Sequence, residues 1–216
     1  MSKFVLADLT VTPFHGCDEK LRTAFETFVK GLTLDRDNEP GDDPEKGTWV
    51  WVNENEAALR PGQPYSTFIF QERTSGEIVA TASFVQDDRA TAAKLGVDKD
   101  RRYFGIWGFF LARHDLRRLG LGTIIAKYVD DYVQAQVDDG KTERLVYLFT
   151  SVPHAMKMYE RLGFVRQDQS VNLPEFGFDE TLFKKTYSPR GNGFGGASGI
   201  FKNLLRLVRR FFMPAG

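Results

Sequence analysis

One short glycine-containing segment constrains the fold of this chain more than any other feature. Residues 117–122 read RRLGLG and separate two regular patterns. The run before them, residues 104–112, consists of apolar residues and glycine and predicts a buried strand, whereas the run after them repeats apolar side chains at helical spacing. Glycine lets a ligand approach the backbone, and the first amides of a helix are unpaired and carry its positive dipole end. The sequence therefore predicts a strand, a loop and a helix that together hold a phosphate or a diphosphate.

A second pattern follows further along the chain. Residues 144–150 (RLVYLFT) predict another strand, which leads into Ala155-x-x-x-Tyr159-x-x-x-Gly163-Phe164. In this order and separation, the two segments resemble the GNAT superfamily of acyl-CoA-dependent N-acetyltransferases. The resemblance covers residues 104–164, extends to the strands on either side, and does not include the C-terminal tail. It implies a layered α/β fold with a mixed, mostly antiparallel central sheet of six to seven strands flanked by helices.

The rest of the chain predicts a mixed order of strands and helices. A helix begins after Cys17, with Asp18 as its N-terminal cap, and residues 33–64 contain too many glycines and prolines for a long regular element. The further strands expected are residues 3–10, 66–72, 77–87, 164–171 and 180–187. The second and third of these are separated by residues 73–76, which is hairpin spacing and predicts antiparallel pairing. This order indicates α/β layers around a mixed sheet.

Composition indicates a globular protein with one main domain. The chain has 216 residues, 42% of them hydrophobic and 27% charged, and no apolar run reaches the length of a membrane span. Cys17 is the only cysteine, so an intrachain disulfide is impossible, and the N-terminus lacks the apolar core of a signal peptide. We expect a cytoplasmic protein with an acyltransferase-like domain at residues 1–188, a glycine-rich linker at 189–199 and a basic amphipathic helix at 200–213.

The net charge of zero conceals an acidic body and a basic tail. Seven basic side chains and no acid follow Glu180, so residues 1–180 keep 22 basic and 29 acidic side chains. Two interpretations of the basic helix remain equal. Either it lies on the inner, anionic surface of a membrane, or it docks on the acidic body, its own or a partner subunit's, to extend the core or to form a homodimer. Nucleic acid is not expected as a partner, because the body is acidic.

The resemblance also implies an activity and a donor site. The expected reaction moves an acetyl group from acetyl-CoA to an amine of a small molecule or a protein, by direct attack in a ternary complex. The backbone near residues 110–112 would hold the pantetheine and acyl group, and the backbone of residues 118–123 the diphosphate. The implied cofactor-binding residues are Phe110, Leu111, Ala112, Arg117, Arg118, Leu119, Gly120, Leu121, Gly122, Thr123 and Ser151.

The resemblance places a proton donor at Tyr159, where a tyrosine hydroxyl protonates the departing thiolate. A phenol with a pKa of about 10 is protonated at neutral pH. A helix tyrosine that packs its ring into the core is the alternative interpretation.

The general base is less well marked, because residues 104–112 contain no acid. The nearest alternatives in sequence are Glu72, Asp87, His114 and Asp115. His114 has the most suitable ordinary pKa and is the candidate base, and a water chain without a dedicated base is the other interpretation. Val152 stands where many relatives have asparagine, and Ser151 is the expected replacement for that cofactor contact.

Two further functions stay open. The absence of an acid from residues 104–112 is compatible with a non-catalytic module that binds acyl-CoA, and a membrane-seeking tail would suit transfer of a longer acyl chain.

The identity of the acceptor amine depends on how residues 33–64 fold over the sheet. Trp49 and Trp51 either line the acceptor pocket or anchor this loop on the core. His15 and Cys17 have no further clustered ligands, so a metal is not expected.

Overall fold

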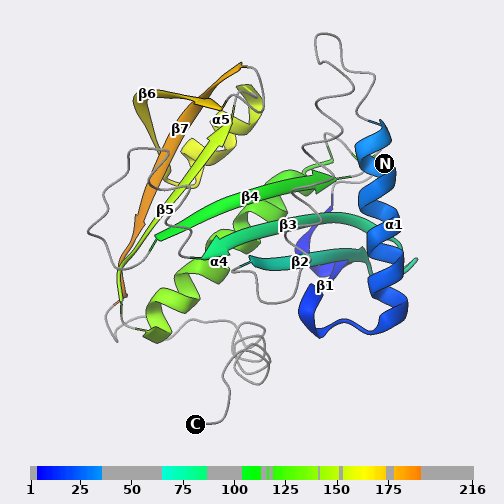
Figure 1. Ribbon diagram of the computed structural model, residues 1–216. Coiled ribbons are helices and arrows are strands. Elements are labelled where there is room, and N and C mark those ends of the chain that lie inside the picture. Colours follow the sequence, from blue (N-terminus) through cyan, green and yellow to red (C-terminus); the bar gives the residue numbers. More distant parts are fainter. Residues whose placement is uncertain are drawn as a thin grey trace.

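The computed structural model describes residues 4–35, 65–86, 104–112, 116, 119–140, 142–150, 153–173 and 178–190. These ranges form a seven-stranded sheet with the order β1-β2-β3-β4-β5-β7-β6 (Figure 1). The strands are β1 (Leu9–Pro13), β2 (Tyr65–Glu72), β3 (Ile78–Gln86), β4 (Phe104–Ala112), β5 (Arg144–Thr150), β6 (Val165–Leu173) and β7 (Phe178–Tyr187). The helices are α1 (Glu19–Asp35), α4 (Leu121–Gly140) and α5 (Pro153–Arg161), with short 3-10 turns η1 (Leu6–Asp8) and η2 (Phe14–Gly16).

All neighbouring strands pair antiparallel except β4 and β5, which are parallel. The predicted mixed, mostly antiparallel sheet with flanking helices is therefore confirmed. The basic helix expected at residues 200–213 lies outside the described residues, as do most of the linker and the loop with Trp49 and Trp51.

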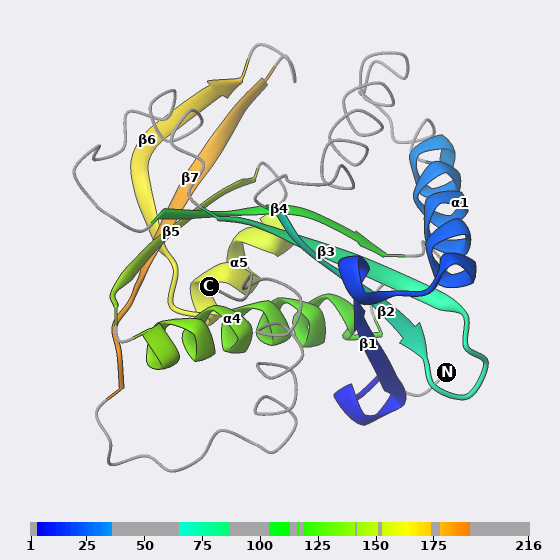
Figure 2. The same cartoon turned by 60° about the horizontal axis from the view of Figure 1, so that its bottom comes forward.

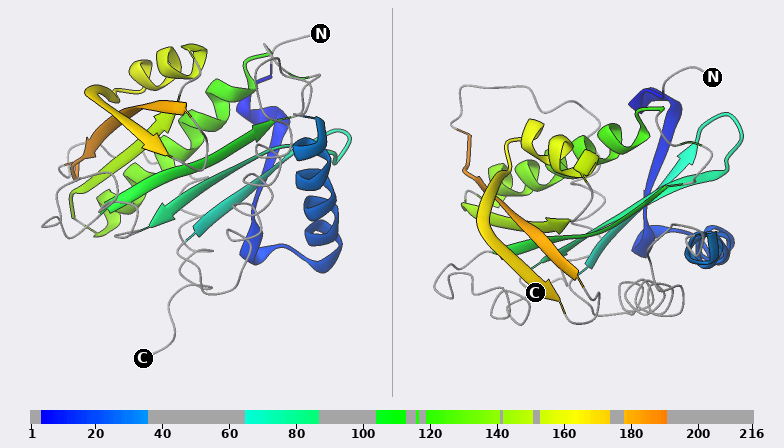
Figure 3. Two further views of the ribbon diagram at one scale, coloured as in Figure 1. Left: turned by 45° about the horizontal axis from the view of Figure 1, so that its top comes forward. Right: turned by 90° about the horizontal axis from the view of Figure 1, so that it is seen from above.

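Helices cover both faces of the sheet. Helix α1 lies on one face, and α4 and α5 lie on the other (Figures 2 and 3). Strand β2 contributes to a hydrophobic cluster on each face. Phe68 and Phe70 belong to the cluster that contains the buried residues of α4. Ile69 belongs to the cluster on the α1 side, with Phe14 and Phe25. Alternate residues of a strand point to opposite faces, so both sides of β2 are apolar.

The helical spacing read from the sequence places the buried face of α4 correctly. Eight of its apolar residues are buried: Leu121, Ile125, Ala126, Tyr128, Val129, Tyr132, Val133 and Val137. The ring of Phe68 on β2 packs edge-to-face on Tyr132, with 4.8 Å between the ring centroids. Among the described helices, none combines the length and the apolar character needed to span a bilayer.

The N-terminal strand expected at residues 3–10 is wrong in its bounds. Residues 6–8 form η1, and the strand begins only at Leu9. The Asp8 carboxylate accepts a hydrogen bond from the Val5 amide at 2.9 Å, which satisfies a backbone group locally and favours a tight turn over a strand.

Two other local predictions are confirmed. The Leu21 amide donates to the Asp18 carboxylate at 2.8 Å, so Asp18 caps α1. Strands β2 and β3 form the expected antiparallel hairpin, and Gly76 adopts a φ of +73° in its turn.

Candidate functional site

The described part of the glycine-containing segment, residues 119–122, lies beside buried apolar side chains. Leu116 and Leu121 are buried, and the Leu119 carbonyl accepts a hydrogen bond from the Phe4 amide at 3.1 Å. Between these anchors, Gly120 adopts a φ of +82°, a conformation that L-residues with a side chain rarely take. Gly120 therefore turns the chain into α4.

The first turn of α4 presents backbone donors. The Ile124 amide donates to the Gly120 carbonyl at 3.2 Å and makes the first intrahelical bond. The amides of Leu121, Gly122 and Thr123 precede it, so helix geometry gives them no intrahelical acceptor. Amides in this position, at the positive end of a 20-residue helix, are suited to bind an anion. Arg117, Arg118, His114 and Ser151 lie outside the described residues.

Strands β4 and β5 separate from each other towards their carboxyl ends (Figure 1). Their pairing is confined to Phe104 with Leu145, Gly105 with Val146 and Ile106 with Tyr147. Beyond these pairs, in the described part of the chain, β4 pairs only with β3 and β5 only with β7. Among the described strands, none pairs with the edge of β4 that faces β5 at residues 110–112.

A bulge bends β4 where it leaves β5. Ala82 pairs with Phe110 and Phe84 with Trp107, so β4 has two residues opposite the single residue Ser83. Such an extra residue disrupts the ladder locally and increases the bend of its strand. Gly108, one of two glycines in this strand, lies at the bulge and is the sequence signal that could have indicated it.

Tyr159 is buried on the same face of the sheet as α4. Tyr159 is 9% exposed. Its ring centroid lies 5.9 Å from that of Phe164 and 6.5 Å from that of Phe183 on β7. Phe183 is the register partner of Leu148 on β5, so Tyr159 lies beside the carboxyl-terminal half of β5. Burial raises the pKa of the Tyr159 phenol, which keeps the hydroxyl protonated at neutral pH.

The sequence motif around Tyr159 corresponds to a helix ending. Gly163 adopts a φ of +85°, its amide donates to the Glu160 carbonyl at 3.0 Å, and the Phe164 amide donates to the Tyr159 carbonyl at 3.0 Å. These bonds make a Schellman motif, in which a contact between the residue after the glycine and the last helical turn is expected. The Tyr159–Phe164 ring pair is that contact. The glycine and phenylalanine of the motif therefore fix the tyrosine in the core.

The structure separates one of the candidate bases from β4. Glu72 lies at the end of β2, with β3 between it and β4, and its carboxylate accepts a hydrogen bond from Ser75 Oγ at 2.7 Å within the hairpin turn. Asp87, His114 and Asp115 lie outside the described residues.

A pair of buried hydroxyl groups lies close to the bulge and was not foreseen. Ser83, directly opposite the bulge, shares a 2.9 Å hydrogen bond with Thr67, and both residues are buried. That Ser83 and Thr67 lie opposite each other depends on the register of the two strands, which the local sequence pattern does not reveal.

In the described ranges, no three histidine, cysteine, aspartate or glutamate side chains come together as a metal site would require.

Comparisons with known proteins agree with this geometry. The family model of the Acetyltransferase (GNAT) family matches residues 28–164, which contain both the glycine loop and Tyr159. No curated protein sequence matches the chain.

Several solved structures share the fold. The Corynebacterium glutamicum structure "histone acetyltransferase HPA2 and related acetyltransferase" is 18% identical, with a TM-score of 0.54 over 87% of this chain and 99% of that one. A GNAT-family acetyltransferase from Bordetella pertussis is 14% identical, with a TM-score of 0.53 over 86% and 99%. Spermidine N-acetyltransferase from Vibrio cholerae is 12% identical, with a TM-score of 0.51 over 83% and 94%. The resemblance read from the two motifs is thus confirmed, and the chain belongs to the GNAT acetyltransferase family, whose members transfer an acetyl group from acetyl-CoA to an amine.

Proposed function

We propose that this protein is an N-acetyltransferase that transfers the acetyl group of acetyl-CoA to an amine of a small molecule or a protein by direct attack in a ternary complex. One observation carries the proposal: the glycine-turned N-terminus of α4 and the buried Tyr159 of α5 flank the region where β4 and β5 separate. Such an arrangement suits a ligand with a diphosphate at one end and a thioester at the other.

The donor would be bound mainly by backbone groups. The amides at the start of α4, within residues 118–123, would hold the diphosphate, with added charge from Arg117 and Arg118. At Phe110, Leu111 and Ala112, where β4 no longer pairs with β5, the backbone of β4 would form hydrogen bonds with the pantetheine as it would with a neighbouring strand. Ser151, directly after β5, would add one further contact. Because the first amides of α4 and the backbone of β4 belong to regular elements, little ordering of these groups is needed when the donor binds.

In the proposed reaction, the neutral amine attacks the carbonyl carbon of the thioester. The negative charge that develops on the carbonyl oxygen needs hydrogen-bond donors, which the backbone near the β4 bulge would supply. The carbon–sulfur bond then breaks, the amine nitrogen loses a proton to His114 or to a water chain, and the thiolate of CoA takes a proton from the Tyr159 hydroxyl. No covalent enzyme intermediate forms.

Thiol release from acetyl-CoA tests this function. The amine panel should include spermidine and a lysine-containing peptide, because proteins with similar folds are named for spermidine and for histones. The proposal predicts thiol release that depends on an amine and is matched by acetylated product.

A non-catalytic acyl-CoA-binding module is the second candidate, and the absence of an acid from β4 favours it. Saturable binding of acetyl-CoA, with no thiol release for any amine, would establish the module. Faster release from a longer acyl-CoA than from acetyl-CoA would instead assign a longer acyl donor.

The basic helix at residues 200–213 is proposed, from the sequence, to lie on an anionic membrane surface or to join two subunits of a cytoplasmic protein. The described fold ends in an anchored segment: the Arg190 guanidinium is 2.9 Å from the Asp138 carboxylate of α4. A chain that stops after Arg190 therefore keeps this anchor and is the matched control.

Sedimentation with phosphatidylglycerol vesicles, and mass measurement in solution, compare the two chains. Loss of vesicle binding in the shorter chain would support the membrane interpretation, and conversion of a dimer to a monomer would support the subunit contact. Identical behaviour of both chains would contradict both the membrane contact and the contact between subunits.

A further inference from the structure

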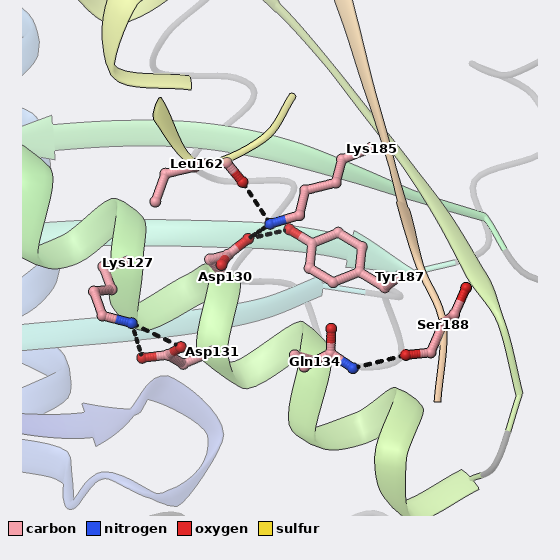
Figure 4. A network of polar contacts seen from close by, with 8 residues as sticks. All are labelled: Lys127, Asp130, Asp131, Gln134, Leu162, Lys185, Tyr187 and Ser188. Atoms are coloured by element: carbon pink, nitrogen blue, oxygen red, sulfur yellow. Dashed lines mark hydrogen bonds and ion pairs between the residues drawn. The ribbon is translucent and has the colours of Figure 1, made fainter. Parts of the chain in front are cut away.

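Lys185 of β7 connects the two helices that carry the site (Figure 4). Its Nζ lies 2.5 Å from Oδ1 of Asp130 on α4 and donates a hydrogen bond to the Leu162 carbonyl at the end of α5, at 2.6 Å. The side chains of Lys185 and Asp130 are only 18% and 17% exposed. The ammonium group thus makes its contacts in a region that is largely shielded from water.

Aromatic rings and a glycine surround the same ammonium group. Its Nζ lies 4.5 Å from the ring centroid of Tyr187 and 5.7 Å from that of Phe164, and the Tyr187 hydroxyl donates to Asp130 at 2.5 Å. A Cβ added to Gly163 would lie 3.8 Å from Lys185 Cε. Lys185 is therefore fixed by contacts with α4, with the end of α5 and with its own strand.

The positive charge of Lys185 stabilises the C-terminal end of α5. The last carbonyls of a helix carry its negative dipole end and lack intrahelical donors, so a cation there stabilises the terminus. Lys185 supplies that cation to Leu162, next to the Schellman motif that fixes Tyr159. At the same time its ion pair with Asp130 attaches α5 to α4.

The attachment matters because the two helices would hold the two ends of one donor molecule. If the diphosphate binds at the start of α4 and the sulfur lies near Tyr159, the position of α5 relative to α4 determines whether the hydroxyl reaches the sulfur. A displacement of about 1 Å away from the reacting geometry costs up to about a hundredfold in rate.

From this arrangement we infer that Lys185 is a positioning residue, which holds α5 on α4 so that the Tyr159 hydroxyl meets the thiolate of CoA. In this role Lys185 acts through Tyr159 and not by binding the donor or the acceptor. This inference rests on the proposed acyl transfer.

A double-mutant cycle separates positioning from general stability. Lys185→Met keeps most of the buried stem and removes the ammonium group. It should lower kcat at least about tenfold, with a smaller change in the KM for acetyl-CoA. In a Tyr159→Phe background, where the hydroxyl is already gone, the same substitution should change kcat less than about twofold.

The matched control is Lys127→Met, which removes an ion pair on the exposed side of α4. There Nζ lies 2.9 Å from Asp131, but the two side chains are 64% and 38% exposed. This variant should keep the wild-type kcat. If Lys185→Met does not fold, Asp130→Asn serves in its place, because it keeps the shape and the acceptor for Tyr187 while removing the negative charge.

Amide hydrogen exchange supplies a readout that does not need turnover. The Gly163 and Phe164 amides donate to carbonyls of α5, so their exchange should accelerate in Lys185→Met and remain unchanged in Lys127→Met. Unchanged exchange in Lys185→Met, or equal losses of kcat with and without the Tyr159 hydroxyl, overturns the positioning role. A wild-type protein that turns over no amine contradicts the proposed function, and the exchange measurement then still decides whether Lys185 holds α5.

Discussion

Individual residues with unusual backbone conformations mark the two functional segments. Gly120 and Gly163 both have positive φ, the first at the start of α4 and the second directly after α5. Both were part of the sequence motifs. What the motifs did not reveal is why each glycine is needed: Gly120 turns the chain towards the helical amides, and Gly163 returns Phe164 to the ring of Tyr159.

Replacing Gly120 tests the loop at this scale. Gly120→Val places a branched side chain at a φ of +82°, where strain of about 1–3 kcal/mol is expected even though a Cβ would meet nothing within 4 Å. The substitution should raise the KM for acetyl-CoA about tenfold through distortion of the first amides. Gly140→Ala, at the end of the same helix and also in open space, is the control and should leave this KM unchanged. Equal KM values for all three proteins would remove the loop from donor binding.

At the scale of elements, the sequence predicted the helices and strands with regular apolar spacing, but it did not predict which residues of neighbouring strands lie opposite each other. Strand β5 and the buried face of α4 follow from local patterns, and the Asp18 cap follows from residue type. The bulge in β4 and the hydroxyl pair of Ser83 and Thr67 depend on which residues of two strands lie opposite each other. Register is decided by tertiary packing, so these features became visible only in the structure.

Buried tyrosines join the helix layer to the sheet and predict a pH dependence of stability. Burial raises the pKa of Tyr128 on α4, of Tyr159 on α5 and of Tyr187 on β7, and the charge of Asp130 adds to the effect on Tyr187. In the unfolded chain these phenols ionise at about pH 10, whereas in the folded chain they keep their protons to higher pH. Their contribution is therefore complete below about pH 10 and is lost as the pH rises further, by about 1.4 kcal/mol per pH unit for each tyrosine.

Urea unfolding between pH 8 and pH 11.5 measures this effect. The free energy of unfolding should decline above about pH 10, and Tyr187→Phe should make the decline less steep by removing one of the buried phenols. A free energy that does not change over this range, or a decline of equal slope in the variant, would contradict the burial of these phenols.

For the molecule as a whole, the described sheet consists of two parts that meet at three residue pairs of β4 and β5. A donor bound between the separating strands would contact both parts and would bind only the folded protein. At a free acetyl-CoA concentration of about 100 times Kd, folding should gain about 2.7 kcal/mol. Thermal unfolding with and without acetyl-CoA measures the gain, and Gly120→Val at the same concentration should show a smaller one. Equal melting temperatures with and without acetyl-CoA would contradict a donor site.

Steady-state kinetics of the wild type and of Tyr159→Phe, with free CoA and acetylated amine measured in the same reaction, test the central claim most directly. The wild type should form CoA and acetylated amine in equal amounts, only when an amine is present. Tyr159→Phe should lower kcat at least about a hundredfold, because general acid catalysis contributes that much, and should bind acetyl-CoA as tightly as the wild type. Equal kcat values would contradict the role of Tyr159, and the absence of acetylated amine from the wild-type reaction with every amine would contradict acyl transfer itself.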